Sequence, residues 1–441
     1  MMKTPHGDEN SLLPYFPGYE YKFGKSTYMG EEVGEGGYVY AEPGIYYNVA
    51  LLDIASMHPH SDLAECLFGP RFTKAFYDIV YGRVHIKHEA WDEVNKMLDG
   101  KFKPYVEKVI AGEMTSKDLA NALKTAINSV YGLTAAKFDN PFRDKRNVDN
   151  IVAKRGALFM INLKHEVQKR GFTVAHIKTD SIKIPNATPE IIQFVMDYGA
   201  RYGYSFEHEA TYKKMCLVND AVYIAQYADG DKEHKFKLST GEEIITDWTA
   251  TGKQFAVPYV FKTLFSKSPI IFEDLCETFS VSKGDLYLDR NEGLPDVSDL
   301  EKKIEKIKKE LNKVKANNSN PSSMGAVPTN VIYDLESQIA ELQAEIDKGH
   351  NLIFVGRVGQ FCPIQSGKGG GVLYRVADGK NYAAAGTTGY RWLESEMVKT
   401  LEKENDIDKS FYQHLVDEAV STISKYGDID IFCDRDSNVP P

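Results

Sequence analysis

The chain has 441 residues, a formal net charge of −10, 42% hydrophobic residues and 26% charged residues, which are ordinary values for a globular protein of two or three domains. No apolar run is long enough to span a bilayer and the first residues lack a signal peptide's apolar stretch, so we expect a cytoplasmic protein without a membrane partner. The net charge argues mildly against nucleic acid as a partner, but local basic patches decide backbone binding.

The five cysteines are far apart in the sequence. They form neither a CxxC pair nor a Cys/His spacing suited to zinc. An odd, scattered set predicts reduced thiols in a reducing compartment.

The first elements predict a strand followed by helices. Residues 1–45 favour turns and short strands, and the apolar run 46–56 predicts a strand that contains Asp53. The pattern is then helical from about 70 to 131. Its clearest helix is 116–132, for which Ser116 is the expected cap and Gly132 the expected end.

Strands and helices then alternate irregularly. We expect a helix over 150–171, a strand or hairpin over 172–185, a helix over 190–203 and a pair of strands over 212–227. This order favours an α+β fold over a doubly wound sheet.

Two helical stripes follow in the C-terminal half and predict an antiparallel helical hairpin over 296–350. The apolar positions are Leu300, Ile304, Ile307, Leu311 and Val314, then Leu335, Ile339, Leu342 and Ile346. The first helix is basic and the second acidic, so a second interpretation gives the basic face to a DNA backbone. The later stretch SGKGGGVLYRV (366–376) lacks the phosphate-loop spacing and predicts a glycine-rich turn before a strand.

Two acids stand at strand ends, Asp53 in VALLD and Asp180 in HIKTDSIKI. Each alone is typical of a cap, a turn or a salt bridge. If the two met, their carboxylates would repel and one would stay protonated unless a cation lay between them. Two magnesium ions about 4 Å apart could then hold the attacking and leaving oxygens of a phosphoryl transfer.

A third stretch, KTAINSVYG (124–132), places Lys124, Asn128 and Tyr131 on one face of a helix. A nucleoside triphosphate could use all three, through charge, a hydrogen bond and ring contact. The alternative is a solvated helix face with a buried tyrosine.

Together, DIASMHP (53–59), KTAINSVYG (124–132) and HIKTDS (176–181) resemble three motifs of family B DNA polymerases, in the family's order. The middle motif, Lys-x-x-x-Asn-Ser-x-Tyr-Gly, matches at every fixed position. GEGGYV (34–39) is similar to the family's Gly-Gly segment, and YKKMCLVNDAVY (212–223) is similar to its primer-gripping segment.

The resemblance implies a right-hand polymerase fold with a mixed palm sheet, short helical fingers and a helical thumb that carries the inserted hairpin. The expected ranges are 1–66 and 133–230 for the palm, 67–132 for the fingers and 231–441 for the thumb.

The implied activity is DNA-templated DNA synthesis, in which a primer 3′-hydroxyl attacks the α-phosphate of a dNTP and releases pyrophosphate. Asp53, Asp180 and the backbone of Ile54 would hold two Mg²⁺ ions. The nucleotide would contact Ser56, Met57, His58, Lys124, Asn128 and Tyr131. The primed DNA template would contact Thr179, Lys213, Lys214 and Tyr223.

Three departures from the family pattern shape the alternatives. Lys178 stands where the family usually has an aspartate, and His58 replaces the tyrosine that blocks a ribose 2′-hydroxyl. Only 52 residues precede Asp53, too few for the family's proofreading exonuclease, so we expect a separate exonuclease-bearing chain or an exonuclease-free form, as in a bacteriophage or another virus. The alternatives are a non-catalytic DNA-binding subunit derived from a polymerase, and a nuclease or reverse transcriptase, although the adjacent Asp-Asp typical of the latter is absent.

Overall fold

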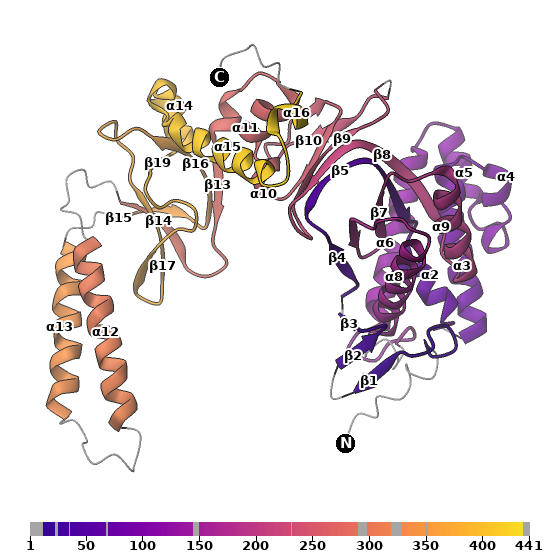
Figure 1. Ribbon diagram of the computed structural model, residues 1–441, viewed down its shortest axis with the longest axis horizontal. Helices are drawn as coiled ribbons and strands as arrows, with labels where there is room; N and C mark the ends of the chain where they lie inside the picture. Colours follow the sequence, from indigo (N-terminus) through magenta and orange to yellow (C-terminus); the bar gives the residue numbers. More distant parts are fainter. Residues whose placement is uncertain are drawn as a thin grey trace. The chain divides into compact units, whose positions relative to one another are not determined.

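The computed structural model describes residues 12–22, 25–34, 36–67, 69–143, 150–230, 232–289, 298–318, 329–348 and 352–434. The chain divides into two compact units (Figure 1). Unit 1 contains residues 1–237, 243–256 and 420–441, and unit 2 contains 238–242 and 257–419. Across the described ranges, no helix combines the length and apolar character needed to cross a membrane.

A seven-stranded sheet is the centre of unit 1, in the order β12-β9-β8-β5-β7-β6-β4. The strands are β4 (Val39–Ala41), β5 (Gly44–Ile54), β6 (His176–Lys178), β7 (Ser181–Pro185), β8 (Phe206–Leu217), β9 (Tyr223–Tyr227) and β12 (Trp248–Thr251). All of its described pairings are antiparallel. The expectation of a mixed sheet was therefore wrong, because tight hairpins such as β6–β7 reverse the chain.

The two faces of this sheet differ in chemistry because side chains alternate along each strand. Ala50, Leu52 and Ile54 of β5 belong to the main core, beside helices α8 (Ile151–Lys169) and α9 (Pro189–Arg201). The alternate residues of β5, which include Asp53, point to the other face. One face of the sheet thus holds the main core. The other carries a smaller hydrophobic cluster, which includes Val49 and Leu51, together with the acid Asp53.

Unit 1 also contains a helical region between β5 and α8, as the sequence predicted. Its helices are α2 (Met57–Ala64), α3 (Gly69–Lys87), α4 (Trp91–Val94), η1 (Met97–Gly100), α5 (Lys103–Ile110) and α6 (Ser116–Thr134). Phe76 and Val80 of α3 pack with Ile127 of α6. These two long helices pack against each other, and α2 contacts both (Figure 1).

The long helix α6 begins at Ser116, as the sequence predicted, but its capping residue lies one position earlier and its end two residues later than expected. The cap is Thr115, whose hydroxyl accepts a hydrogen bond from the Asp118 N–H at 3.1 Å, while the Asp118 carboxylate accepts one from the Thr115 N–H at 3.3 Å. This reciprocal pair is a capping box, so the expected Ser116 cap was wrong. The helix continues through Gly132 to Thr134.

Smaller elements complete unit 1. They are the sheet β1 (Glu20–Lys22), β2 (Lys25–Tyr28) and β3 (Glu31–Val33), the ribbon β10 (Lys235–Lys237) and β11 (Glu243–Ile245), and the short helices α10 (Lys253–Ala256) and α16 (Ile429–Phe432).

Unit 2 is richer in strands than expected. One sheet has the order β13-β16-β19 and another β15-β14-β17-β18. The strands are β13 (Glu277–Ser280), β14 (Asp285–Asp289), β15 (Leu352–Gly356), β16 (Val358–Ile364), β17 (Val372–Ala377), β18 (Lys380–Ala383) and β19 (Arg391–Glu394). The expectation of a helical thumb was therefore wrong for much of this region, where buried residues such as Leu286 and Leu288 recur with the period of a strand. The predicted strand after the glycine-rich turn is confirmed as β17.

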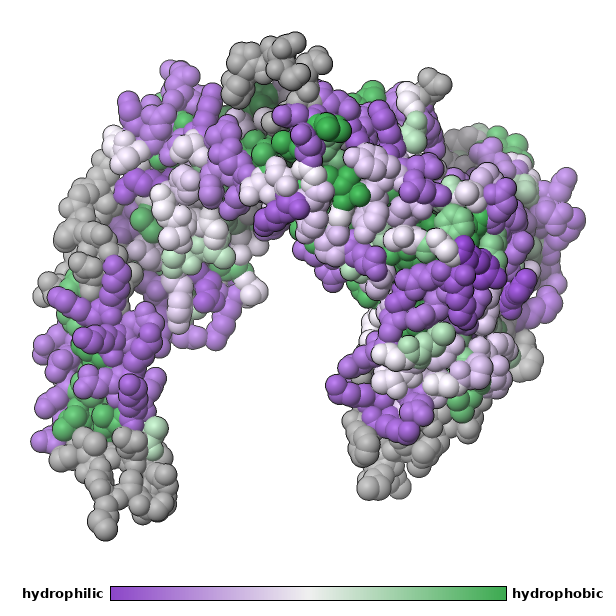
Figure 2. Space-filling view, in the orientation of Figure 1, coloured by the Kyte–Doolittle hydropathy of each residue, from purple (hydrophilic) through white to green (hydrophobic). Residues whose placement is uncertain are grey.

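The helices of unit 2 include the predicted hairpin. They are α11 (Pro258–Phe261), η2 (Lys262–Ser266), η3 (Phe272–Leu275), α12 (Ser298–Asn318), α13 (Thr329–Lys348), α14 (Ser395–Thr400), η4 (Glu404–Asp406) and α15 (Lys409–Ser424), whose last residues belong to unit 1. Helices α12 and α13 run antiparallel, and Ile304, Leu311 and Leu335 are buried between them. Their outer surface is mostly hydrophilic (Figure 2). Ile346, which was also expected to be an apolar position of the hairpin, is not among the residues whose side chains the structure describes.

Candidate active site

The two strand-end acids of the sequence come together in unit 1. Asp53 is the penultimate residue of β5 and pairs with Ser181, the first residue of β7. Asp180 lies in the turn just before β7, and its carbonyl accepts a hydrogen bond from the Ile54 N–H at 2.9 Å. Thr179 adopts a left-handed conformation with φ of 57°, which makes this turn tight. Local backbone geometry therefore fixes the two carboxylates as neighbours.

The negative charges of Asp53 and Asp180 are not fully compensated by nearby cations. Burial, together with the charges of Asp180, Glu209 and Glu207, raises the pKa of Asp53 to about 7, and Lys183 opposes this rise. Burial also raises the pKa of Asp180. Like-charged carboxylates in a half-buried site stay ionised more readily when a cation binds.

Lys183 on β7 is a buried cation close to these two acids. It is 3% exposed, and its ammonium lies 3.2 Å from Nδ1 of His176 on the neighbouring strand β6. Its charge opposes the rise in the pKa of Asp53 and of Asp180. Lys178, by contrast, ends β6 with an exposed side chain.

The turn after β5 carries a second group of site residues. Ser56 is left-handed, with φ of 57°, and precedes α2. Its hydroxyl accepts a hydrogen bond from Nη1 of Arg83 at 3.3 Å. The Met57 side chain is buried, and a Cβ at Gly156 would lie only 2.4 Å from its Cε, so a larger residue there would require the end of the Met57 side chain to shift.

His58 and Tyr131 form one wall of the site. Their rings are stacked, with centroids 5.0 Å apart and planes inclined by 6°. Burial lowers the pKa of His58, so the imidazole is neutral at pH 7. Two flat rings therefore stand between α2 and α6.

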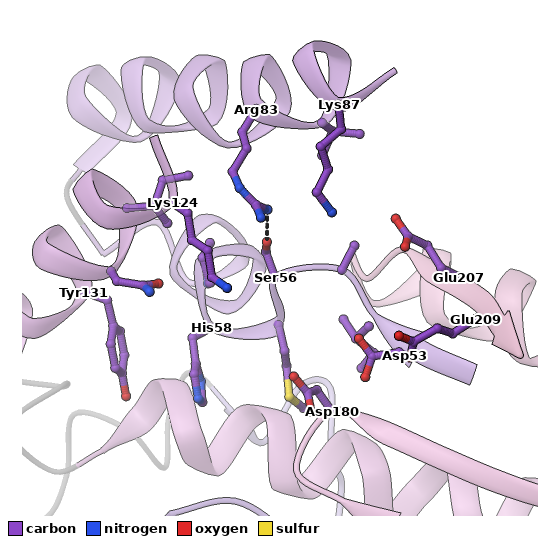
Figure 3. A pocket seen from close by; sticks show the side chains of 17 residues that line it. Asp53, Ser56, His58, Arg83, Lys87, Lys124, Tyr131, Asp180, Glu207 and Glu209 are labelled. Carbon is purple, nitrogen blue, oxygen red and sulfur yellow. Dashed lines mark hydrogen bonds between the residues drawn. The ribbon is translucent and has the colours of Figure 1, made fainter. Parts of the chain in front are cut away.

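A single cavity of about 380 Å³ joins these groups (Figure 3). The residues that line it are Asp53, Ile54, Ala55, Ser56, Met57, His58, Pro59, Arg83, Val84, Lys87, Lys124, Ile127, Asn128, Tyr131, Asp180, Glu207 and Glu209. Both of the acids and all six of the nucleotide residues expected from the sequence are among them.

Four charged residues of this cavity were missed by the sequence reasoning. Arg83 and Lys87 come from α3, and Glu207 and Glu209 come from β8. The i, i+4 spacing of the two cations could have indicated a shared helix face. Figure 3 shows Arg83, Lys87 and Lys124 reaching in from the helices, opposite the carboxylates.

The expected primer residues do not line the cavity. Thr179 belongs to the tight turn, where its N–H donates to the Tyr38 carbonyl at 2.9 Å. Lys213 is exposed on β8, whereas Lys214 is 3% exposed and its ammonium lies 2.8 Å from a carboxylate oxygen of Asp434. Tyr223 begins β9, with its ring centroid 4.9 Å from the Lys183 ammonium.

The carboxylates have the chemistry that Mg²⁺ prefers, which is one or two carboxylates completed by water and substrate phosphate. Within the described ranges, no group of three or more His, Cys, Asp or Glu side chains is arranged to hold an ion by itself. The raised pKa of Asp53 fits a site that a cation completes. Asp53 and Asp180 thus suit a metal that arrives with an anionic substrate.

No protein-family model and no curated protein matches the chain. Among solved structures, the chain is similar to the family B DNA polymerase from the hyperthermophilic archaeon Pyrobaculum calidifontis, with 13% sequence identity and a TM-score of 0.36. The match covers 90% of this chain and 48% of the archaeal chain, so the chain spans about half the length of that polymerase. At this level of similarity, the side chains of the cavity are the evidence for function.

Proposed function

We propose that the protein is a DNA-templated DNA polymerase that adds deoxynucleotides to a primer 3′-hydroxyl. The observation that carries the proposal is the cavity itself, where two strand-end carboxylates face three cations on two helices. Asp53, Lys124 and Asp180 each belong to one of the three sequence stretches that resemble the motifs of family B polymerases.

The cationic side of the cavity suits the triphosphate. Arg83, Lys87 and Lys124 supply charge, and guanidinium and ammonium groups bind phosphate oxygens. The hydrogen bond from Arg83 to Ser56 ties α3 to the turn before α2, which keeps this cation in place. Asn128 adds a hydrogen-bonding group to the same helix face as Lys124.

The anionic side suits the reacting atoms. Asp53 and Asp180 would hold Mg²⁺, with the backbone of Ile54 beside them. When bound, the ions would stabilise the charge that develops on the attacking and leaving oxygens. The carboxylates orient these groups, and the cations opposite them neutralise the pyrophosphate as it leaves. Glu207 and Glu209 increase the negative potential around Asp53.

Primer extension on a primed DNA template with Mg²⁺ and dNTPs tests the proposal. We expect the wild type to extend the primer, and Asp53→Ala and Asp180→Ala each to reduce extension by several orders of magnitude while circular dichroism stays unchanged. Glu166→Ala changes an acid on α8 that does not line the cavity, so it is the matched control and should keep activity. Full activity in either aspartate variant would remove the metal assignment.

His58 makes the choice of sugar a separate question. The resemblance implies that a larger tyrosine ring at this position excludes a ribose 2′-hydroxyl, and the imidazole is smaller. We expect His58→Tyr to increase the ratio of kcat/KM for dNTPs to that for rNTPs. An unchanged ratio would show that the His58–Tyr131 wall does not contact the sugar.

A non-catalytic DNA-binding subunit is the second candidate, favoured by Lys178 beside Asp180. It predicts template binding without nucleotide incorporation, and little effect of Asp180→Ala on that binding. Adding a separate exonuclease-bearing chain would then be the next assay.

A further inference from the structure

Two thiols from distant parts of unit 2 lie side by side. Cys276 follows η3 and directly precedes β13, and Cys362 is in the middle of β16. Their sulfur atoms are 3.5 Å apart, although 86 positions separate them in the sequence. Both belong to unit 2, whereas the candidate active site belongs to unit 1.

The register of the two strands explains the approach. β13 and β16 are antiparallel, and Glu277 is paired with Phe361. The next position in this register sets Cys276 opposite Cys362. Directly opposed residues of antiparallel strands have Cα atoms about 4.5–5.5 Å apart. Disulfides span Cα separations of about 4.4–6.8 Å, so the backbone already has a compatible spacing.

Only a small side-chain movement would form the bond. An S–S bond is about 2.05 Å long, so the two sulfur atoms would approach by about 1.5 Å. Rotation about the Cα–Cβ bonds can supply this movement without a change of strand register.

The two thiols differ in exposure, which assigns them different roles. Cys276 is partly exposed and Cys362 is fully buried. The hydrogen bond from the Cys362 thiol lowers the pKa of Cys276, and the Lys399 ammonium acts in the same direction. Thiolates are the nucleophiles in disulfide exchange. Cys276 is therefore the attacking thiol and Cys362 the resolving one.

We propose that Cys276 and Cys362 form a redox modification site, a dithiol that a small-molecule disulfide such as oxidised glutathione converts reversibly into an intramolecular disulfide. The Cys276 thiolate attacks one glutathione sulfur, forms a mixed disulfide and releases one glutathione thiolate. Cys362 then loses its proton and attacks the Cys276 sulfur, which releases the second glutathione. One oxidised glutathione is reduced to two glutathiones, and the protein dithiol is oxidised by two electrons.

The other three cysteines belong to unit 1. Cys216 and Cys433 are buried, and burial together with the charge of Cys433 raises the pKa of Cys216, whereas Cys66 is exposed. Cys66 is therefore the control for a thiol that is accessible without an opposed partner on the neighbouring strand.

Peptide mapping of the full-length protein tests the site. The protein is equilibrated in buffers of oxidised and reduced glutathione, free thiols are blocked by alkylation, and the digest is analysed by mass spectrometry without reduction. We expect a linked pair of peptides that contain Cys276 and Cys362, and its loss after dithiothreitol. Cys66→Ser should retain the link, whereas Cys362→Ser should leave glutathione attached to Cys276.

Three results would overturn the proposal. Both cysteines could remain alkylatable in the most oxidising buffer, Cys276 could pair with a different cysteine, or the link could form only after heating has unfolded unit 2. The mapping of the wild type decides each case, so a serine variant that fails to fold does not affect the test.

Discussion

Two helices supply the cations of the cavity, which makes their separate contributions measurable. Lys124 comes from α6 and Arg83 from α3, and neither residue belongs to the sheet that carries Asp53. We expect Lys124→Ala and Arg83→Ala each to raise the KM for dNTP by about 10-fold or more, because a charge-assisted hydrogen bond to phosphate contributes about 1.5–3 kcal/mol. The Kd for primed DNA, measured by fluorescence anisotropy, should change less. An equal loss of nucleotide and DNA affinity would count against a phosphate role.

Asp62 on α2 is a buried acid that the proposed chemistry does not use. It is 0% exposed, and among the described residues neither carboxylate oxygen has a hydrogen-bond partner. Burial raises the pKa of Asp62 to about 8. Since an unfolded aspartate has a pKa of about 3.9, the folded protein binds the proton more tightly than the unfolded chain does.

The sign of the pH effect follows from this difference. Between about pH 4 and pH 8 the folded state keeps the proton that the unfolded state has lost, so this group makes the free energy of unfolding fall by up to about 1.4 kcal/mol per pH unit. Asp62→Asn should remove that slope. We therefore expect the variant to gain stability over the wild type as the pH rises from 5 to 8, measured by urea unfolding. A constant difference across this range would mean that Asp62 is ionised in the folded protein.

At the scale of elements, the start of α6 controls the placement of three site residues. The capping box of Thr115 and Asp118 fixes the first turn, two to four turns before Lys124, Asn128 and Tyr131. Thr115→Ala should destabilise the protein by about 1 kcal/mol, because an N-cap hydroxyl satisfies a helix N–H. Thermal unfolding would measure this loss. Thr115→Ser, which keeps the hydroxyl, should restore most of it.

The sequence predicted those elements whose pattern is local. Helix α6, the β6–β7 turn and the α12–α13 hairpin follow from periodicity and turn residues, and the three motifs identified Asp53, Asp180 and the face of α6. Glu207 and Glu209 were missed because their position depends on the pairing of β5 with β8. That register shifts between Leu51 and Leu52, and Asp53 pairs with Glu207. A bulge of this kind sets which side chains share a face, and the sequence of β8 alone does not reveal it.

Contacts between segments that are distant in the sequence were also not predicted. The cysteine spacing predicted reduced thiols and showed no pair, yet the pairing of β13 with β16 brings Cys276 to Cys362. The same limit explains the helical thumb that was expected for unit 2. Short strands there find their partners in other parts of the chain, and their individual patterns are weak.

At the scale of the whole molecule, the helical hairpin is an insertion within a β-hairpin. It connects β14 to β15, and Asp289 of β14 pairs directly with Leu352 of β15. A two-residue Asn-Gly turn is the usual connection for such a pair. Replacing residues 290–351 with this turn should leave unit 2 folded and single-nucleotide addition unchanged. Circular dichroism melting and a single-turnover assay measure the two outcomes, and loss of the folded unit 2 would show that the hairpin is structurally required.

Unit 1 is assembled from segments that lie on both sides of unit 2 in the sequence. Residues 420–441 return to unit 1, where the Phe432 ring lies 5.7 Å from Trp248 and Asp434 pairs with Lys214 of β8. During synthesis, the residues that make these contacts leave the ribosome only after all of unit 2 has been made. Domains fold as their residues emerge during synthesis. Unit 2 can therefore complete its own core before α16 has been made and can pack in unit 1. Synthesis of unit 1 therefore begins first, but its folding is completed last. A nascent chain stalled near residue 419 should expose Trp248 and Lys214.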